Sequence, residues 1–321
     1  QGVFLPGIAK RFAEAADLGA NEAREQILLG TARAYLALQG TSELLKAAQD
    51  AERVSIKRED DAKAQIAAGT AVELNLLRAQ TETASARVNI AAIEGQRQQL
   101  YPLLEGLVGE AVDVVPVGTG SELPTAMRSD KDEPWESSFA VRSAIEQVHG
   151  TEKSVDYDTW QWLPSIVGIA KGNYNSNEGF TGHNFTYDLI VAAQIPLYDR
   201  GARYAQRKED LAKLQQALAN LAASRARARS NWLGARANVG AAEAQLKQAQ
   251  AQEALATRAQ SQVDASAKAG LATSLDLVDA DNRRFLASSN VVQARTSLEV
   301  RRAELLTIEG KLFEQLAATK Q

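Results

Sequence analysis

The segment Gly69-Thr-Ala-Val-Glu-Leu-Asn-Leu-Leu-Arg-Ala79 decides the fold, because a second copy follows as Gly270-Leu-Ala-Thr-Ser-Leu-Asp-Leu-Val-Asp-Ala280. The two copies are 201 positions apart (270 − 69). The match continues at the same separation through Ala86 with Ala287, Asn89 with Asn290, Leu104 with Leu305 and Gly109 with Gly310. Self-similarity at one fixed offset indicates an internal duplication, so one supersecondary unit is predicted to occur twice.

Each copy is preceded by a segment with the pattern of a very long helix. Residues 201–270 contain no proline, and apolar or small side chains recur at alternating spacings of three and four. They are Leu211, Leu214, Leu218, Leu221, Ala228, Trp232, Ala235, Val239, Ala242, Leu246 and Ala249, interrupted only by Arg225. This pattern predicts one coiled-coil helix of about 100 Å. Residues 6–68 are predicted to form a similar helix, with Leu28, Thr31, Tyr35, Leu38 and Leu45 on its seam.

After each glycine the chain is expected to return as a second helix, over residues 72–107 and 274–316, which gives two helical hairpins. Between them, residues 110–135 contain Pro116, Pro124 and Pro134 and are predicted to be an irregular linker. A helix over 136–160 follows.

A β-hairpin is predicted after that helix. Apolar residues alternate along 185–195 with the period of two that a strand requires, and 165–174 is its expected partner strand. The polar segment 175–184 would join the two strands. Trp160 and Trp162 stand where aromatic belts lie in membrane barrels. A soluble hairpin covered by a helix remains an alternative at this point.

Composition excludes several classes of function. A net charge of −4 and a pI near 5.5 argue against nucleic-acid binding. Arg225, Arg227 and Arg229 are expected to lie on a solvated face. The absence of cysteine excludes disulfides, and the chain contains no apolar run long enough for a membrane helix. His149 and His183 have no helix-spaced second ligand, so neither a metal, a cofactor nor enzymatic activity is expected.

The order of these elements resembles the TolC-type outer membrane efflux family. The resemblance rests on Gln194-Ile-Pro-Leu-Tyr-Asp-Arg-Gly201 opening a long helix, on Leu163-Pro-Ser165 at the strand entrance, and on the two glycine turns. It implies a mainly α-helical homotrimer whose long coiled-coil hairpins form an α-barrel in the periplasm. The strands would contribute to a transmembrane β-barrel in the outer membrane of a Gram-negative bacterium.

The resemblance also implies a domain layout. Residues 1–109 would be the first hairpin, 110–135 the equatorial linker, 136–162 a short helix, 163–197 the transmembrane β-hairpin, and 198–321 the second hairpin with a C-terminal helix. The family carries an additional β-hairpin before its first long helix. Three copies of this chain would supply six strands, whereas the family's barrel has twelve, so the chain is expected to be part of a longer precursor.

Candidate gating residues lie near the second turn. Asp276 and Asp279 are three residues apart, on one helix face, and by resemblance match the family's aperture aspartates, which would raise each other's pKa values in a trimer. Capping is an open alternative for Asp276, because Thr273 precedes it by three residues, as Thr70 precedes Glu73. Asp281 is expected to be solvated. At the offsets equivalent to Asp276 and Asp279, the first hairpin has Asn75 and Arg78, and Arg78 is a candidate partner for an aspartate.

Further candidate residues follow from the resemblance. The tips at Gly69, Thr70, Gly270, Leu271 and Thr273 would dock a periplasmic adaptor that leads to an inner-membrane transporter, although turn chemistry alone also explains these residues. Trp160, Trp162, Phe185 and Tyr187 would contact outer membrane lipid. The predicted function is a passive export duct for efflux or type I secretion. A periplasmic adaptor and a structural coiled-coil protein are the alternatives.

Overall fold

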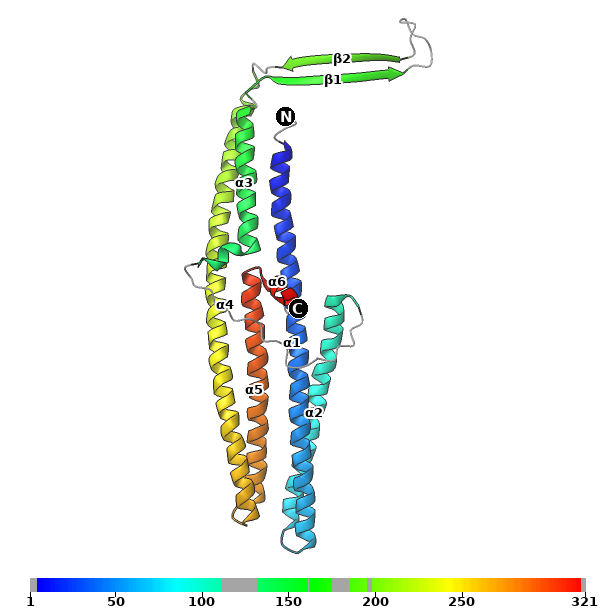
Figure 1. Cartoon of the computed structure of the whole chain (residues 1–321), viewed down its shortest axis with the longest axis vertical. Helices are drawn as coiled ribbons and strands as arrows, with labels where there is room; N and C mark the ends of the chain where they lie inside the picture. Colours follow the sequence, from blue (N-terminus) through cyan, green and yellow to red (C-terminus); the bar gives the residue numbers. More distant parts are fainter. Residues whose placement is uncertain (1–4, 111–131, 161, 175–184, 195–197, 319–321) are drawn as a thin grey trace. The chain divides into compact units, whose positions relative to one another are not determined.

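The computed structural model describes residues 5–110, 132–160, 162–174, 185–194 and 198–318. The predicted linker core at 111–131 and the predicted loop at 175–184 lie outside this part of the chain. The elements, in chain order, are α1 (Leu5–Ala67), α2 (Glu73–Val108), the short 3₁₀ helix η2 (Pro134–Ser137), α3 (Phe139–Trp160), β1 (Ser165–Tyr174), β2 (Phe185–Gln194), α4 (Ala202–Lys268), α5 (Ser274–Ile308) and α6 (Leu312–Ala318) (Figure 1). The predicted mainly helical fold with one β-hairpin is confirmed.

The chain divides into two compact units. One, the β-hairpin unit, comprises Gln1–Asn21 and Glu136–Ala228. The other, the two-hairpin unit, comprises Glu22–Trp135 and Arg229–Gln321. The helices α1 and α4 contribute residues to both units.

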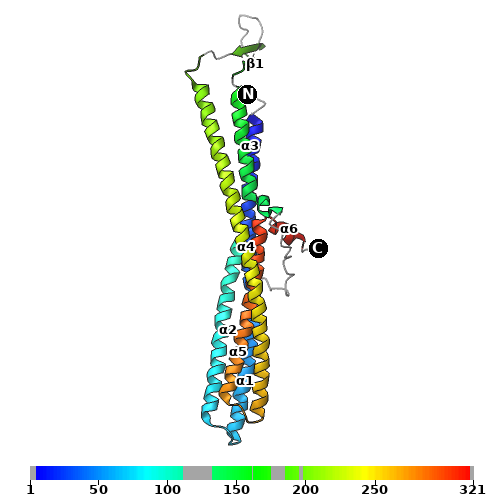
Figure 2. The same ribbon diagram turned by 90° about the vertical axis from the view of Figure 1, so that its left-hand side faces the viewer.

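The two-hairpin unit places α2 and α5 beside the second part of α1, and α5 also beside the second part of α4 (Figures 1 and 2). Its core is a series of small clusters along the helices. Ala34, Leu38 and Leu104 join α1 to α2, while Val239, Ala242 and Leu298 join α4 to α5. Because many of these side chains are alanine or valine, the helices can approach closely, as the low aromatic content predicts.

Close helix packing is most evident at Gly40 of α1. A methyl group added there would overlap the side-chain hydroxyl of Thr296 on α5. Ion pairs flank this contact, with Arg33 bound to Glu304 at 2.6 Å and Arg295 bound to Glu43 at 3.4 Å. The two hairpins are therefore held together by both a steric fit and charged pairs.

The helix over 274–316 is shorter than predicted. It ends at Ile308, and Gly310 then takes a φ of 67°, a conformation that terminates helices. The short α6 begins at Leu312, where the buried Glu25 of α1 accepts a hydrogen bond of 3.2 Å from the Phe313 backbone N–H. The buried Trp232 likewise donates to Glu309 at 3.0 Å.

The β-hairpin unit packs the start of α1 against α3. Arg11 binds Glu146 at 2.9 Å, and the Phe12 ring lies close to Gly150. On α4, the predicted seam residues from Leu221 onward are buried apart from the half-buried Leu246, whereas Leu211 and Leu218 are each 41% exposed.

The arginines of α4 are not simply a solvated face. Arg225 binds Glu136 at 2.9 Å, and Arg229 lies over the Trp135 ring at 5.6 Å. Local spacing could not predict these contacts, because both partners come from the region that precedes α3.

The β-hairpin is antiparallel, with Ser165 opposite Gln194 and Tyr174 opposite Phe185. The predicted positions of both strands are confirmed to within one residue. Its side chains are largely exposed, including Leu189 at 77% and Val191 at 80%. Among the described residues, none of the helices has the length and apolar content to span a membrane.

Candidate functional site

The two helical turns at the ends of the hairpins share one backbone design. Gly69 and Gly270 have φ values of 73° and 74°. The N–H of Gly69 donates to Ile66 O at 2.9 Å and that of Gly270 to Ala267 O at 3.0 Å, while Thr70 and Leu271 donate to carbonyls five residues earlier. This pair of bonds is the Schellman motif, which satisfies the last carbonyls of a helix. The duplicated glycines are therefore required by the turn itself.

The return helices begin differently. At the second turn, the hydroxyl of Thr273 accepts a bond of 3.3 Å from the Asp276 N–H, and Asp276 accepts bonds of 2.8 and 2.7 Å from the Thr273 N–H and hydroxyl. This capping box is the alternative that the sequence left open for Asp276. These hydrogen bonds from the Thr273 side chain and backbone lower the pKa of Asp276.

The first turn has no such box, so the predicted pairing of Thr70 with Glu73 is wrong. The N-cap of α2 is Val72, which has no side chain able to cap. Thr70 instead donates its hydroxyl to Gln65 O at 3.0 Å, because it belongs to the preceding Schellman turn.

The two turns are joined directly. The Ser274 hydroxyl donates to the side-chain oxygen of Asn75 at 3.0 Å. Asp279, by contrast, pairs with Arg283 of its own helix at 2.9 Å, and both side chains are more than half exposed. The structure thus brings Asn75 to the second turn, while the ion pair that it shows for Asp279 is with Arg283 and not with Arg78.

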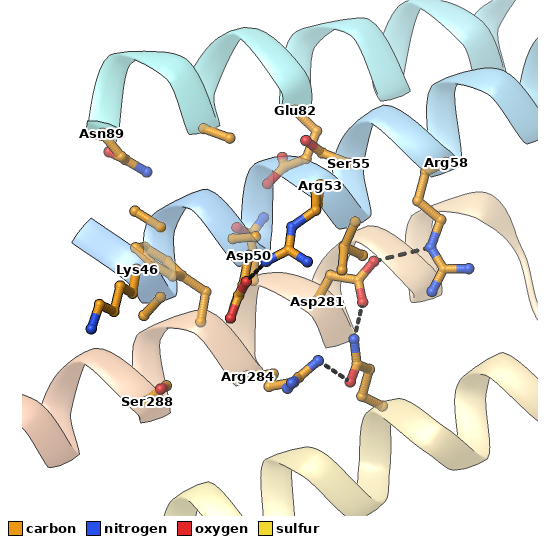
Figure 3. A pocket seen from close by; sticks show the side chains of 18 of the residues that line it. Lys46, Asp50, Arg53, Ser55, Arg58, Glu82, Asn89, Asp281, Arg284 and Ser288 are labelled. Carbon is orange, nitrogen blue, oxygen red and sulfur yellow. Dashed lines mark hydrogen bonds and ion pairs between the residues drawn. The ribbon is translucent and has the colours of Figure 1, made fainter. Parts of the chain in front are cut away.

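Asp281 is not solvated, contrary to the prediction. Its side chain is 14% exposed and accepts bonds of 3.1 Å from Arg58 Nε and 2.5 Å from Gln260 Nε2 (Figure 3). Arg58 also pairs with Asp264, and Arg284 donates to Gln260 at 3.0 Å. This group, here called the Arg58 network, connects α1 with α4 and α5.

Electrostatic interactions within the Arg58 network favour the charged form of Arg58. Burial lowers the pKa of Arg58, but its hydrogen bonds to Asp281 and Asp264 outweigh that effect, and the net pKa is raised. Sequence reasoning missed this network. One signal was available, because the repeat offset aligns Asp264 with Lys63 (264 − 201), a reversal of charge between the two hairpins.

The predicted membrane-contacting residues Trp160, Phe185 and Tyr187 are exposed, and Trp162 contacts two side chains of α4. Trp160 is 52% exposed, and Phe185 and Tyr187 are 58% and 73% exposed. The Trp162 ring meets Tyr204 edge to face at 4.9 Å and lies 4.4 Å from the Arg203 guanidinium. The described residues contain no cluster of potential metal ligands, and His183 lies outside them.

Comparison with known proteins identifies the family. A family model described as outer membrane efflux protein matches residues 134–311, which is more than half of the 321 residues. The chain therefore belongs to the outer membrane efflux protein family, and the resemblance noted from the sequence is confirmed. A search of curated protein sequences gave no significant match.

Solved structures agree with this assignment at the level of the fold. A membrane protein from Pseudomonas aeruginosa matches with a TM-score of 0.76 and 17% identity, over 97% of this chain and 73% of that one. The outer membrane protein VceC of Vibrio cholerae matches with a TM-score of 0.74 and 19% identity, over 95% of this chain and 75% of VceC. The MtrE outer membrane channel of Neisseria gonorrhoeae matches with a TM-score of 0.74 and 18% identity, over 95% of this chain and 70% of MtrE. These TM-scores show a common fold.

Proposed function

We propose that this chain is one protomer of a homotrimeric outer membrane duct that exports substrates passively in an efflux or type I secretion system. The observation that carries this proposal is the pairing of two duplicated helical hairpins with a β-hairpin whose apolar side chains are exposed. The family assignment supports the same function. A periplasmic adaptor protein would connect the duct to an inner-membrane transporter.

The β-hairpin has the dimensions and chemistry of a membrane-spanning pair. Each strand has 10 residues, and about 9–11 residues are needed to cross a bilayer as a tilted strand. One face carries Tyr187, Leu189 and Val191. The opposite face carries Lys171 directly across from Asp188. We assign the apolar face to lipid, with Trp160 and Trp162 near one end and Phe185 and Tyr187 near the other, and the charged face to water.

Two exposed apolar stripes support self-assembly. On α2, Leu74, Leu77 and Val88 are 52%, 54% and 68% exposed, on the side opposite to the buried Ala79, Thr83 and Ala86. On α4, exposed Leu233, Ala237, Gly240, Ala244, Ala251 and Leu255 lie roughly opposite the buried seam. Because the two stripes differ, a contact between them is heterologous and can close into a ring of three.

The helix tips provide the elements of a gate. Asp276 and Asp279 would place six carboxylates around a three-fold axis, with Asn75 and Arg78 as their counterparts on the first hairpin. The Arg58 network would hold α1 against α4 and α5 while the gate is closed. Gly69, Thr70, Gly270, Leu271 and Thr273 form the surface assigned to the adaptor, and Leu271 is 84% exposed there.

Planar bilayer recordings test this function. The protein purified as the longer precursor that the strand count leads us to expect should insert and give cation-selective currents that added multivalent cations block. Replacing Asp279 with Ala should increase conductance and weaken the block, because a carboxylate ring is removed. The partly buried acid Glu253 on α4 provides a control, and Glu253→Ala should leave both the conductance and the block unchanged. Absence of current from a soluble monomer would contradict the duct and favour an adaptor or structural protein.

A further inference from the structure

The two-hairpin unit encloses a cavity of about 800 Å³ between α1, α2 and α5, with Gln260 of α4 at one side (Figure 3). A volume of this size is within the range of sites that hold one small organic molecule. On α1 its lining runs from Glu43 to Arg58, and on α5 it begins at Val278, close to the second turn. The apolar part of its wall includes Ala47, Ala51, Val54, Ala86, Val278 and Phe285.

The acidic side chains around this cavity are mostly neutralised by partners. Glu43 pairs with Arg295, Asp50 pairs with Arg53, and Asp281 belongs to the Arg58 network. Glu82 is the one lining acid for which the described residues provide no ion pair.

The basic side chains are in excess. Lys46 and Lys57 line the cavity without an ion-pair partner among the described residues, and both are exposed. Arg284 donates to the neutral Gln260, so its charge also lacks a carboxylate there. The lining therefore carries five basic and four acidic side chains, a net charge of +1 beside an apolar wall, and Arg58 shares its charge between Asp281 and Asp264.

We infer that this cavity binds a small amphipathic anion, with its apolar body against Ala51, Val54 and Phe285 and its anionic group near Arg284 and Lys46. Burial of an apolar body supplies most of the affinity, and the cations select for negative charge. The assignment goes beyond the export function, because binding at this site does not require an open duct.

Two fluorescent probes of nearly equal shape test the charge selection. One is 8-anilinonaphthalene-1-sulfonate, and the other is N-phenyl-1-naphthylamine, which has the same aromatic body without the sulfonate. Both are titrated into the full chain in a non-ionic detergent, with protein-free detergent as the blank. The anionic probe is expected to bind at least about tenfold more tightly than the neutral one, as two favourable charge contacts would give.

Two variants localise the binding. Lys46→Gln combined with Arg284→Gln should weaken the anionic probe by about tenfold and leave the neutral probe unchanged. Lys247→Gln, which removes an exposed charge from α4 outside the cavity, is the matched control and should change neither. Ala51→Trp should abolish binding of both probes by filling the cavity, and circular dichroism of each variant checks that the helices remain folded.

Several outcomes would overturn the inference. They are equal affinity for the two probes, equal weakening by Lys247→Gln, or unchanged binding in Ala51→Trp. Failure of wild-type protein to bind in its assembled form would mean that a neighbouring helix occupies the cavity instead. The same preparations are recorded in bilayers, so that wild-type protein that conducts but binds neither probe refutes only this site and leaves the duct unaffected.

Discussion

Asp279 and Asp281 are two residues apart on α5, yet their surroundings differ completely. Asp279 is 55% exposed and pairs within its own helix, whereas Asp281 is 14% exposed and binds side chains from α1 and α4. Exposed ion pairs contribute little because water and side-chain entropy offset the attraction. A half-buried group that loses its partner is more costly. We therefore expect these neighbours to respond very differently to the same substitution.

Replacing Asp281 with Asn should lower the free energy of unfolding by about 1–2 kcal/mol, because Arg58 loses a charged acceptor at a site with limited access to water. Urea unfolding followed by circular dichroism measures this change. Asp279→Asn is the matched control and should change stability by no more than about 0.5 kcal/mol. Equal effects of the two substitutions would show that the Arg58 network does not stabilise the unit.

Glu25 is predicted to make stability depend on pH. Burial raises the pKa of this carboxyl above its ordinary value of 4.5, despite hydrogen bonds from the backbone of Phe313 and Leu312. Its second oxygen, Oε2, has no hydrogen-bond partner among the described residues. The folded chain therefore binds the proton more tightly than the unfolded chain, and ionisation of Glu25 costs stability as pH rises above 4.5.

Glu25→Gln should remove this cost, since the amide oxygen can still accept from Phe313 and carries no charge. The melting temperature of the variant minus that of the wild type is expected to increase as pH rises from below 4.5 toward neutrality and then to level off. Glu94→Gln, at an exposed position on α2, should show no such trend. A pH-independent difference for Glu25→Gln would contradict the role of burial.

At the scale of elements, helix ends depend on residues that tolerate a positive φ. Gly69, Gly270 and Gly310 terminate α1, α4 and α5 in the same way. The third of these turns shows why the return helix is shorter than its apolar pattern suggests. The apolar spacing continues beyond Gly310, but the backbone reverses there and a new helix starts.

Gly270→Ala should destabilise the second turn by about 1–2 kcal/mol, because an L side chain in the left-handed conformation meets the following carbonyl. Gly106→Ala is a control that is expected to change stability in the opposite direction. Gly106 lies within α2 with open space around it, so alanine should stabilise by about 0.5–1 kcal/mol. Hydrogen exchange of the backbone amides near each site measures both effects. Destabilisation by both substitutions would contradict this account.

For the molecule as a whole, the proposed trimer depends on the exposed apolar stripes of α2 and α4. An exposed leucine in the middle of such a stripe would be buried against a neighbouring copy, where a charge without a partner is costly. Leu77→Glu is therefore expected to convert the trimer to a monomer without loss of helix content.

Light scattering after size-exclusion chromatography gives the mass of the assembly, and circular dichroism gives its helix content. Gln80→Glu adds the same charge three residues away, at the edge of the stripe and not in its middle, so it should disturb the trimer less than Leu77→Glu. If the Leu77→Glu variant is still a trimer, the α2 stripe is not part of the interface.

The long helices, both strands and the glycine turns could be predicted from the sequence. Each of these is specified by local periodicity or by a residue with unusual backbone freedom, and the duplication makes the signal visible twice. The sequence also indicated the capping alternative for Asp276, because a capping box needs only residues three apart.

The burial of Asp281 and of Glu25, and the hydrogen bond from Ser274 to Asn75, become apparent only from the tertiary structure. Arg58 and Asp281 are 223 positions apart, and Glu25 and Phe313 are 288 apart. No spacing rule relates such residues, because their contact depends on how two coiled-coil hairpins align along their lengths. Alignment is set by the sum of many small side-chain contacts, such as Gly40 against Thr296, and becomes apparent only when both hairpins are packed together.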